Sequence, residues 1–165
     1  MRFGVLGATA AWRRDGTQVP LGGPARRALL ALLLVRPGEA VSAEGLADEL
    51  YGAGGLTSRG GPGHALQSQV SRLRGVLRPD ADIESTPAGY RLTGASGASG
   101  ADVDVDVDVD TARFEVLADD GRAALAAGDA SRAADLLAEA LGLWRGPAFA
   151  DAAETASGEA AAARL

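Results

Sequence analysis

Apolar residues recur at helical spacing between His64 and Leu77. They follow one another at i, i+4, i+7 and i+11, on one side of a helix of about 14 residues: Leu66, Val70, Leu73 and Leu77. On a helical wheel the opposite side carries His64, Ser68, Ser71, Arg72 and Gly75, with Arg74 and Arg78 on the flank. The pattern predicts an amphipathic helix that buries its apolar side and presents Ser and Arg to solvent.

Two further helices and an N-terminal sheet are predicted upstream. Pro24 opens a helix that runs to about Arg36, because a proline in the first helical position removes no helical hydrogen bond. Ser42 is the predicted N-cap of a second, shorter helix, which Gly52 ends. Short apolar stretches at residues 1–7, 10–13 and 17–21 predict an antiparallel sheet at the N-terminus.

A strand, turn and strand follow the third helix and predict a hairpin over residues 83–93. Three helices followed by a hairpin is the plan of a winged helix-turn-helix, in which the third helix enters the major groove of DNA. The pattern alone favours this interpretation and an ordinary amphipathic helix with a solvated polar side about equally.

The remainder of the chain predicts a linker and a helical region. Residues 94–110 combine GASGASG with DVDVDVDVD, which is typical of a flexible acidic linker. Beyond it, two antiparallel helices are predicted to meet at Gly128 and Asp129. Their predicted apolar stripes are Phe114, Leu117, Gly121 and Leu125, then Ala133, Leu136, Leu137, Ala140, Leu141 and Trp144. A third helix is expected near Ala153, and we expect the helical domain to be truncated at Leu165.

Charge is distributed unevenly behind the net value of −6. Residues 1–92 hold 11 Arg and 8 acidic residues, a balance of +3, whereas residues 93–165 hold 5 Arg and 14 acidic residues, a balance of −9. Nucleic-acid binding depends on the local distribution of charge, so an acidic total does not exclude it. A mildly basic first half is compatible with DNA as a partner.

Enzymatic and metal-dependent functions find no support in the residues. An active site needs convergent nucleophiles, acids or a cofactor loop, and the chain holds a single His, no Lys and no Cys. The Gly-rich stretch 52–63 lacks the Gly-Lys-Ser/Thr that completes a phosphate-binding loop. We therefore expect no catalytic residue, metal ligand or cofactor. No apolar run is long enough for a membrane span, and no signal-peptide layout is present, so we expect a cytoplasmic protein without membrane partners.

Three stretches of the sequence resemble one regulator family: LGGPARRALLALLLVRPGEAVSAEGLADELYG, ALQSQVSRLRGVL and TPAGYRL. They are similar to the antibiotic regulatory proteins of Streptomyces, and ARFEVLADDGRAALAAGDASRAADLLAEALGLWRGPAFAD is similar to the bacterial transcriptional activation domain of that family. The resemblance implies a mainly α fold with small β sheets. Residues 1–93 would be an OmpR-like winged helix-turn-helix, 94–110 the linker, and 111–165 a partial domain of the tetratricopeptide-repeat type.

The same resemblance implies a sequence-specific, DNA-binding activator of secondary-metabolite biosynthesis genes. Its expected partners are promoter direct repeats of double-stranded DNA, RNA polymerase holoenzyme, and a second copy of the chain on DNA. Implied DNA contacts are Ser71, Arg72 and Arg74, then Gln67, Ser68 and Arg78 on the same helix, and Thr86 and Arg91 on the hairpin. The alternative is a protein-interaction module in which a degenerate winged helix serves as scaffold.

Overall fold

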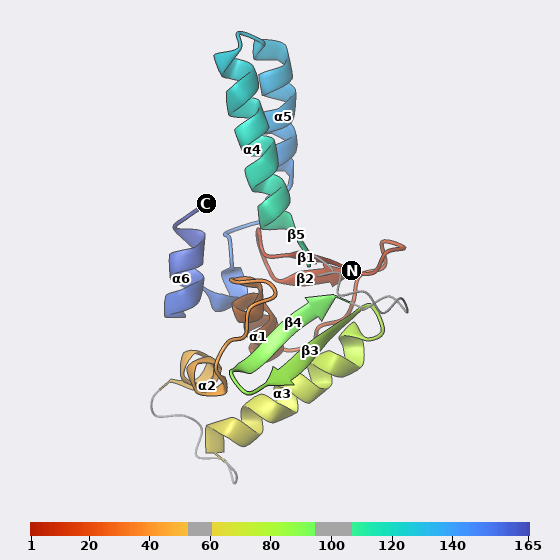
Figure 1. The fold of residues 1–165 in the computed structure, drawn as a ribbon, viewed down its shortest axis with the longest axis vertical. Coiled ribbons are helices and arrows are strands. Elements are labelled where there is room, and N and C mark those ends of the chain that lie inside the picture. Colours follow the sequence, from red (N-terminus) through yellow and green to blue (C-terminus); the bar gives the residue numbers. More distant parts are fainter. Residues whose placement is uncertain (53–60, 95–106) are drawn as a thin grey trace.

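The computed structural model describes residues 1–52, 61–94 and 107–165, and within these residues it is mainly helical with two small sheets (Figure 1). This confirms the expected class, mainly α with small β sheets, and the winged-helix assignment stays a prediction. A three-helix unit comes first, made of α1 (Pro24–Leu34), α2 (Ala43–Tyr51) and α3 (Gly61–Leu77), with the hairpin β3 (Ala81–Thr86) and β4 (Gly89–Gly94) beside α3.

Local sequence signals set the ends of α1 and α2. Pro24 occupies the first turn of α1, as predicted. The Oγ of Ser42 accepts a hydrogen bond from the backbone N–H of Gly45 at 3.0 Å, which satisfies one of the unpaired donors at the start of α2. Gly52 follows the last residue of α2 with φ of 72°, a conformation that favours glycine. Both predicted caps of α2 are confirmed.

The core of the three-helix unit is made of long aliphatic side chains. The predicted apolar stripe of α3 is fully buried, which confirms it: Leu66, Val70, Leu73 and Leu77. Leu29, Leu30 and Leu33 from α1 lie in the same cluster, and Ile83 and Leu92 cover it from the hairpin. Burial of each such side chain contributes roughly 1.5–3 kcal/mol of transfer free energy. The apolar side of α3 is thus fixed to the core, and its other side is left to solvent.

The N-terminal sheet differs from the prediction. It contains β1 (Arg2–Gly4), β2 (Ala10–Trp12) and β5 (Asp108–Val109) in the order β2-β1-β5; β1 pairs antiparallel with β2 and parallel with β5. The antiparallel pairing of the first two predicted strands is confirmed, whereas the third strand expected over residues 17–21 is wrong, because β5 takes the third place in the sheet. Gln18 forms only an isolated bridge with Trp12, and Pro20 has no N–H to donate to a ladder.

Two antiparallel helices, α4 (Asp110–Ala126) and α5 (Ala130–Gly142), form a helical arm that projects away from α3 (Figure 1). The carboxylate of Asp129 accepts a hydrogen bond from the N–H of Arg132 at 3.0 Å, so the predicted N-cap is confirmed. The helices meet through small buried residues: Ala118, Gly121, Ala124, Ala133 and Ala140. Leu125 and Leu141 are 59% and 67% exposed, so their place in the predicted stripes was wrong.

After the arm, the chain returns to α1 through the short 3-10 helix η1 (Ala150–Ala152) and α6 (Ala156–Ala162). Phe149, Ala152 and Ala161 are buried in the same cluster as the leucines of α1. The N–H of Phe149 also donates to the carbonyl of Val5 at 2.6 Å. The C-terminal segment therefore completes the core of the three-helix unit.

Asp110 joins the arm to the N-terminal sheet. Its buried carboxylate accepts hydrogen bonds from the N–H of Val5 at 2.8 Å, the N–H of Leu6 at 3.2 Å, and Nη2 of Arg145 at 3.0 Å. Strand β5 and Asp110 belong to the segment 94–110 that we interpreted as a linker, and residues 95–106 of it lie outside the described residues. The division into a winged helix-turn-helix (1–93), a linker (94–110) and a partial helical domain (111–165) stays a prediction.

Candidate nucleic-acid interface

The solvent side of α3 is the first part of the candidate interface. Because Leu66, Val70, Leu73 and Leu77 hold the helix on the core, the opposite side carries exposed Gln67, Ser71 and Arg72, with Ser68 half-buried. Among the described residues, no hydrogen bond or ion pair engages the side chain of Arg72. This guanidinium keeps all its donors for an external acceptor.

Arg74 is directed toward the hairpin instead. Its Nε donates to the carbonyl oxygen of Ile83 at 2.5 Å, and its Nη2 donates to the Oγ of Ser85 at 2.9 Å. The guanidinium thereby satisfies a carbonyl on the edge of β3 that no neighbouring strand pairs. Arg74 holds β3 beside α3, whereas the sequence grouped it with Ser71 and Arg72; a role in DNA contact stays a prediction.

Arg78, just beyond the end of α3, pairs with the first acidic residue of β3. Its Nη2 lies 2.6 Å from Oδ2 of Asp82, and Nε of Arg74 lies 3.7 Å from Oδ1 of the same carboxylate. Burial by itself raises the pKa of Asp82, but hydrogen bonds from Arg78 and from the N–H of Ile83, with the charges of Arg78 and Arg74, bring that pKa below its ordinary value. The hydrogen bond to Asp82 in turn raises the pKa of Arg78.

The hairpin holds the remaining predicted contacts. Glu84 and Arg91 lie directly opposite each other in the β3–β4 ladder, and Nη2 of Arg91 is 2.7 Å from Oε2 of Glu84. The hydroxyl of Thr86 donates to the carbonyl of Gly89 at 3.2 Å and closes the turn. Thr86 and Arg91 are both half-buried.

Sequence reasoning found the arginines of this region but missed their partners. Asp82 and Glu84 alternate with buried Ala81 and Ile83 along β3, so both carboxylates stand on the outer side of the hairpin. The alternation of apolar and acidic residues over 81–84 was available in the sequence and could have revealed them. Their carboxylates change the accessible charge of the interface, because they neutralise Arg78 and Arg91.

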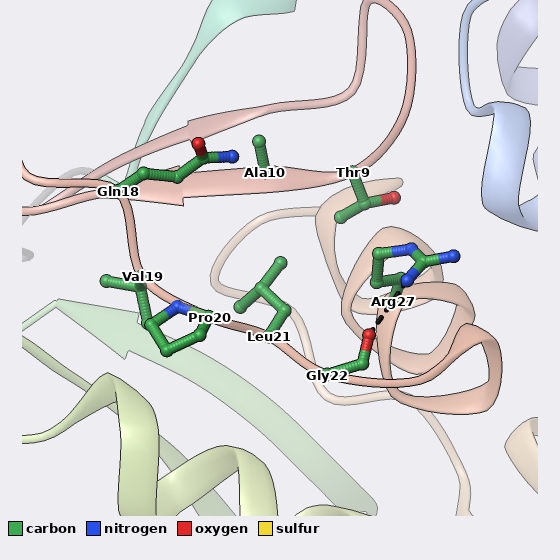
Figure 2. A pocket seen from close by; sticks show the side chains of 8 residues that line it. All are labelled: Thr9, Ala10, Gln18, Val19, Pro20, Leu21, Gly22 and Arg27. Carbon is green, nitrogen blue, oxygen red and sulfur yellow. Dashed lines mark hydrogen bonds between the residues drawn. The ribbon is translucent and has the colours of Figure 1, made fainter.

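Other parts of the described chain give weaker evidence of a binding site. A pocket of about 280 Å³ lies beside α1 (Figure 2), lined by Thr9, Ala10, Gln18, Val19, Pro20, Leu21, Gly22 and Arg27. Its Arg27 is already engaged, by the carbonyl of Gly22 at 2.8 Å and by Asp151 at 2.8 Å. Within residues 1–52, 61–94 and 107–165, no three His or acidic side chains gather as a metal site would require. Nor does any helix of these ranges combine the length and apolar character that crossing a membrane requires.

Comparisons with known proteins point to one kind of regulator. Residues 109–165 match the family described as the bacterial transcriptional activator domain. The chain is 41% identical over 153 residues to the regulatory protein AfsR of Streptomyces coelicolor, covering 91% of this chain and 14% of AfsR. It is 41% identical over 128 residues to the transcriptional regulator RedD of the same species, covering 78% of this chain and 35% of RedD.

A solved structure supports the same relationship over nearly the whole chain. Mycobacterium tuberculosis EmbR, in complex with a low-affinity phosphopeptide, superposes with a TM-score of 0.75 at 30% identity, over 99% of this chain and 41% of the EmbR chain. The chain thus spans well under half the length of these relatives. The matches confirm the family resemblance: over most of its length the chain is similar to transcriptional regulators of the Streptomyces antibiotic regulatory protein type.

Proposed function

We propose that this chain regulates transcription by binding promoter DNA, with residues 1–93 acting as a winged helix-turn-helix. Helix α3 would enter the major groove and direct Ser71 and Arg72 toward base edges and phosphates, with Gln67 and Ser68 beside them. The β3–β4 hairpin would be the wing, and Arg91 and Thr86 would approach the backbone of the duplex. The regulators among the relatives support the role in transcription.

One observation carries the proposal: Arg72 is exposed on the open side of a helix whose other side is anchored by four buried residues. An arginine without an internal partner gives up no hydrogen bond or ion pair when it binds, and its planar fork matches the acceptors of guanine or a phosphate. Ser71 beside it supplies a short donor and acceptor. An ordinary solvated helix face would tolerate loss of Arg72 without consequence.

The test measures binding of the full chain to DNA that contains promoter direct repeats, by gel shift or fluorescence anisotropy. Arg72→Ala is expected to cost about 1–3 kcal/mol of specific binding. Arg132→Ala is the matched control, since Arg132 is exposed at the start of α5, near the end of the arm farthest from α3 (Figure 1), and its side chain has no partner among the described residues. Both variants remove one positive charge, so a difference between them reports position and not net charge.

Salt dependence separates this function from its alternative. Neutralisation of phosphates by arginine releases counterions, so the affinity should fall steeply as salt rises. Equal binding by the Arg72→Ala and Arg132→Ala variants, or an affinity that does not respond to salt, would contradict the proposal. Partner capture without any DNA affinity would favour the protein-interaction module.

The wider role of the protein is also part of the proposal. On the family resemblance, two copies would occupy adjacent direct repeats and help to recruit RNA polymerase holoenzyme to promoters of secondary-metabolite biosynthesis genes. The helical arm projects away from α3, so it would remain accessible when α3 lies in the groove (Figure 1). Transcription in vitro with purified polymerase, with and without the protein, would test this step directly.

A further inference from the structure

Carboxylates of β3 occupy arginines that the proposed interface needs. Of the arginines Arg72, Arg74, Arg78 and Arg91, only Arg72 is free of an acidic or carbonyl partner within the described residues. Asp82 binds Arg78 at 2.6 Å and Glu84 binds Arg91 at 2.7 Å. Both ion pairs are on the outer side of the hairpin, where a duplex lying against α3 and the wing would approach.

A carboxylate and a phosphate present the same chemistry to a guanidinium, namely paired anionic oxygens that accept N–H donors. A phosphate oxygen can therefore bind Arg78 or Arg91 only after the carboxylate has given up the same donors. Exposed ion pairs of this kind are worth only about 0.2–1 kcal/mol, so they are weak enough to exchange. They still lower the affinity for DNA by the free energy that is lost when each pair opens.

We propose that Asp82 and Glu84 are intramolecular competitors of DNA phosphate, which hold Arg78 and Arg91 in the free protein and are displaced when DNA binds. The inference rests on the proposed function, since it concerns how strongly the same interface binds. The two acidic residues of β3 would then limit the affinity of the protein for DNA. Only a duplex that also satisfies Ser71 and Arg72 on α3 would then bind tightly enough to open both ion pairs.

Glu84 offers the sharper test of the two residues. Its side chain makes one ion pair among the described residues, with Arg91, whereas Asp82 also accepts from the N–H of Ile83 and approaches Arg74. Glu84 is exposed on the hairpin, so Glu84→Gln preserves its shape and removes the charge without disturbing the core. Glu115→Gln is the matched control, because Glu115 is exposed on α4 and makes no ion pair with the described residues.

The experiment compares dissociation constants of the full chain for direct-repeat DNA at several salt concentrations. Glu84→Gln is expected to tighten binding by up to about fivefold, which is the upper end of the exposed ion-pair energy expressed as a ratio. It should also steepen the slope of log K against log salt by up to about 0.9, because one more net positive charge then faces the counterions of the duplex. Glu115→Gln should leave the affinity nearly unchanged at 0.15 M salt, since exposed charges more than about 8 Å apart are largely screened there.

Repeating the comparison in an Arg91→Gln variant shows whether the tighter DNA binding of Glu84→Gln acts through Arg91. In an Arg91→Gln chain, adding Glu84→Gln should give no more tightening than Glu115→Gln gives. Asp82→Asn repeats the test at Arg78 and should tighten binding in the same direction, so the inference does not depend on one folded variant.

The possible results separate the inference from the function on which it rests. Weaker binding by Glu84→Gln, a gain equal to that of the control, or a gain that survives Arg91→Gln overturns the competition while DNA binding stands. Absence of DNA binding by the wild type and every variant overturns the proposed function and the competition together.

Discussion

The three-helix unit and the helical arm are held together by different means. Among the residues that the structure describes, the largest fully buried side chains, from Phe3 to Leu92, all precede residue 95, and most are leucines. In the arm, the buried positions other than Asp110 at its base are alanines and Gly121, and large side chains such as Leu125 and Leu141 face solvent. Burial of apolar area stabilises the three-helix unit, whereas close approach of two helices stabilises the arm. Since an alanine buries little area, the arm depends more on its attachment at Asp110.

The largest difference is expected from truncating one leucine in each region. Leu73→Ala removes a fully buried side chain of α3 and should lower the free energy of unfolding by about 2–5 kcal/mol, the range for buried leucines. Leu141→Ala removes an exposed side chain of the arm and should change the free energy of unfolding by less than about 0.5 kcal/mol. Urea denaturation of both variants would check this. A comparable loss in the Leu141 variant would mean that the exposed side of the arm is covered in solution.

The attachment of the arm should be the next most sensitive point. Asp110→Asn places an amide where the carboxylate receives the N–H groups of Val5 and Leu6 and the guanidinium of Arg145. Loss of charge-assisted hydrogen bonds at a buried site should destabilise the protein by about 2 kcal/mol. Hydrogen exchange would show faster opening at the β1–β5 edge. Unchanged protection there would mean that the sheet does not depend on Asp110.

Close approach of α4 and α5 is expected to have a smaller but specific effect. A Cβ at Gly121 would come within 2.7 Å of Cγ of Leu137, whereas one at Gly142 meets nothing within 4 Å. Alanine favours a helix over glycine by about 1 kcal/mol, and crowding opposes that gain only at Gly121. Gly121→Ala should therefore have the lower melting temperature of the two alanine variants, measured by circular dichroism. The reverse order would show that Leu137 moves aside without cost.

The smallest effect belongs to the outer ion pair of the hairpin. Asp82 is titrated at a lower pH in the folded chain than its ordinary value of 3.8, so its contribution is present above that value and is lost as the pH falls through the lower folded-state pKa. Asp82→Asn should cost less than about 1 kcal/mol at neutral pH because solvent screens the pair. The difference in unfolding free energy between wild type and Asp82→Asn should disappear once the pH falls below the folded-state pKa of Asp82. A difference that persisted in acid would point to a cause other than charge.

Much of the three-helix unit was predictable because each signal is local. The spacing of Leu66, Val70, Leu73 and Leu77 identified both the helix and its buried side, and Ser42 identified the start of α2. In the arm, Asp129 identified the start of α5 in the same way. The third strand of the N-terminal sheet was not predictable in this way. It comes from residues 108–109, about a hundred positions away, and two residues carry no periodicity.

The exposed leucines of the arm show a second limit. Helical spacing places Leu125 and Leu141 on apolar stripes, but contact between two helices is decided by how closely their backbones approach, and small residues at Gly121 and Ala133 set that distance. Within the candidate site, the sequence identified which residues carry positive charge. It could not show that Arg74 reaches Ile83 or that Arg91 meets Glu84, because these pairings depend on the tertiary position of the hairpin.

The return of the chain through Phe149 and α6 to α1 has a practical consequence. Cleavage of the backbone between residues 94 and 107 would leave two fragments that share one core, because Phe149 and Ala161 of the second are buried against leucines of the first. Strand β5 and Asp110 of the second fragment also remain hydrogen-bonded to β1 of the first. A protein nicked in this interval should elute from a sizing column as one particle, and mixing the two halves should reconstitute it.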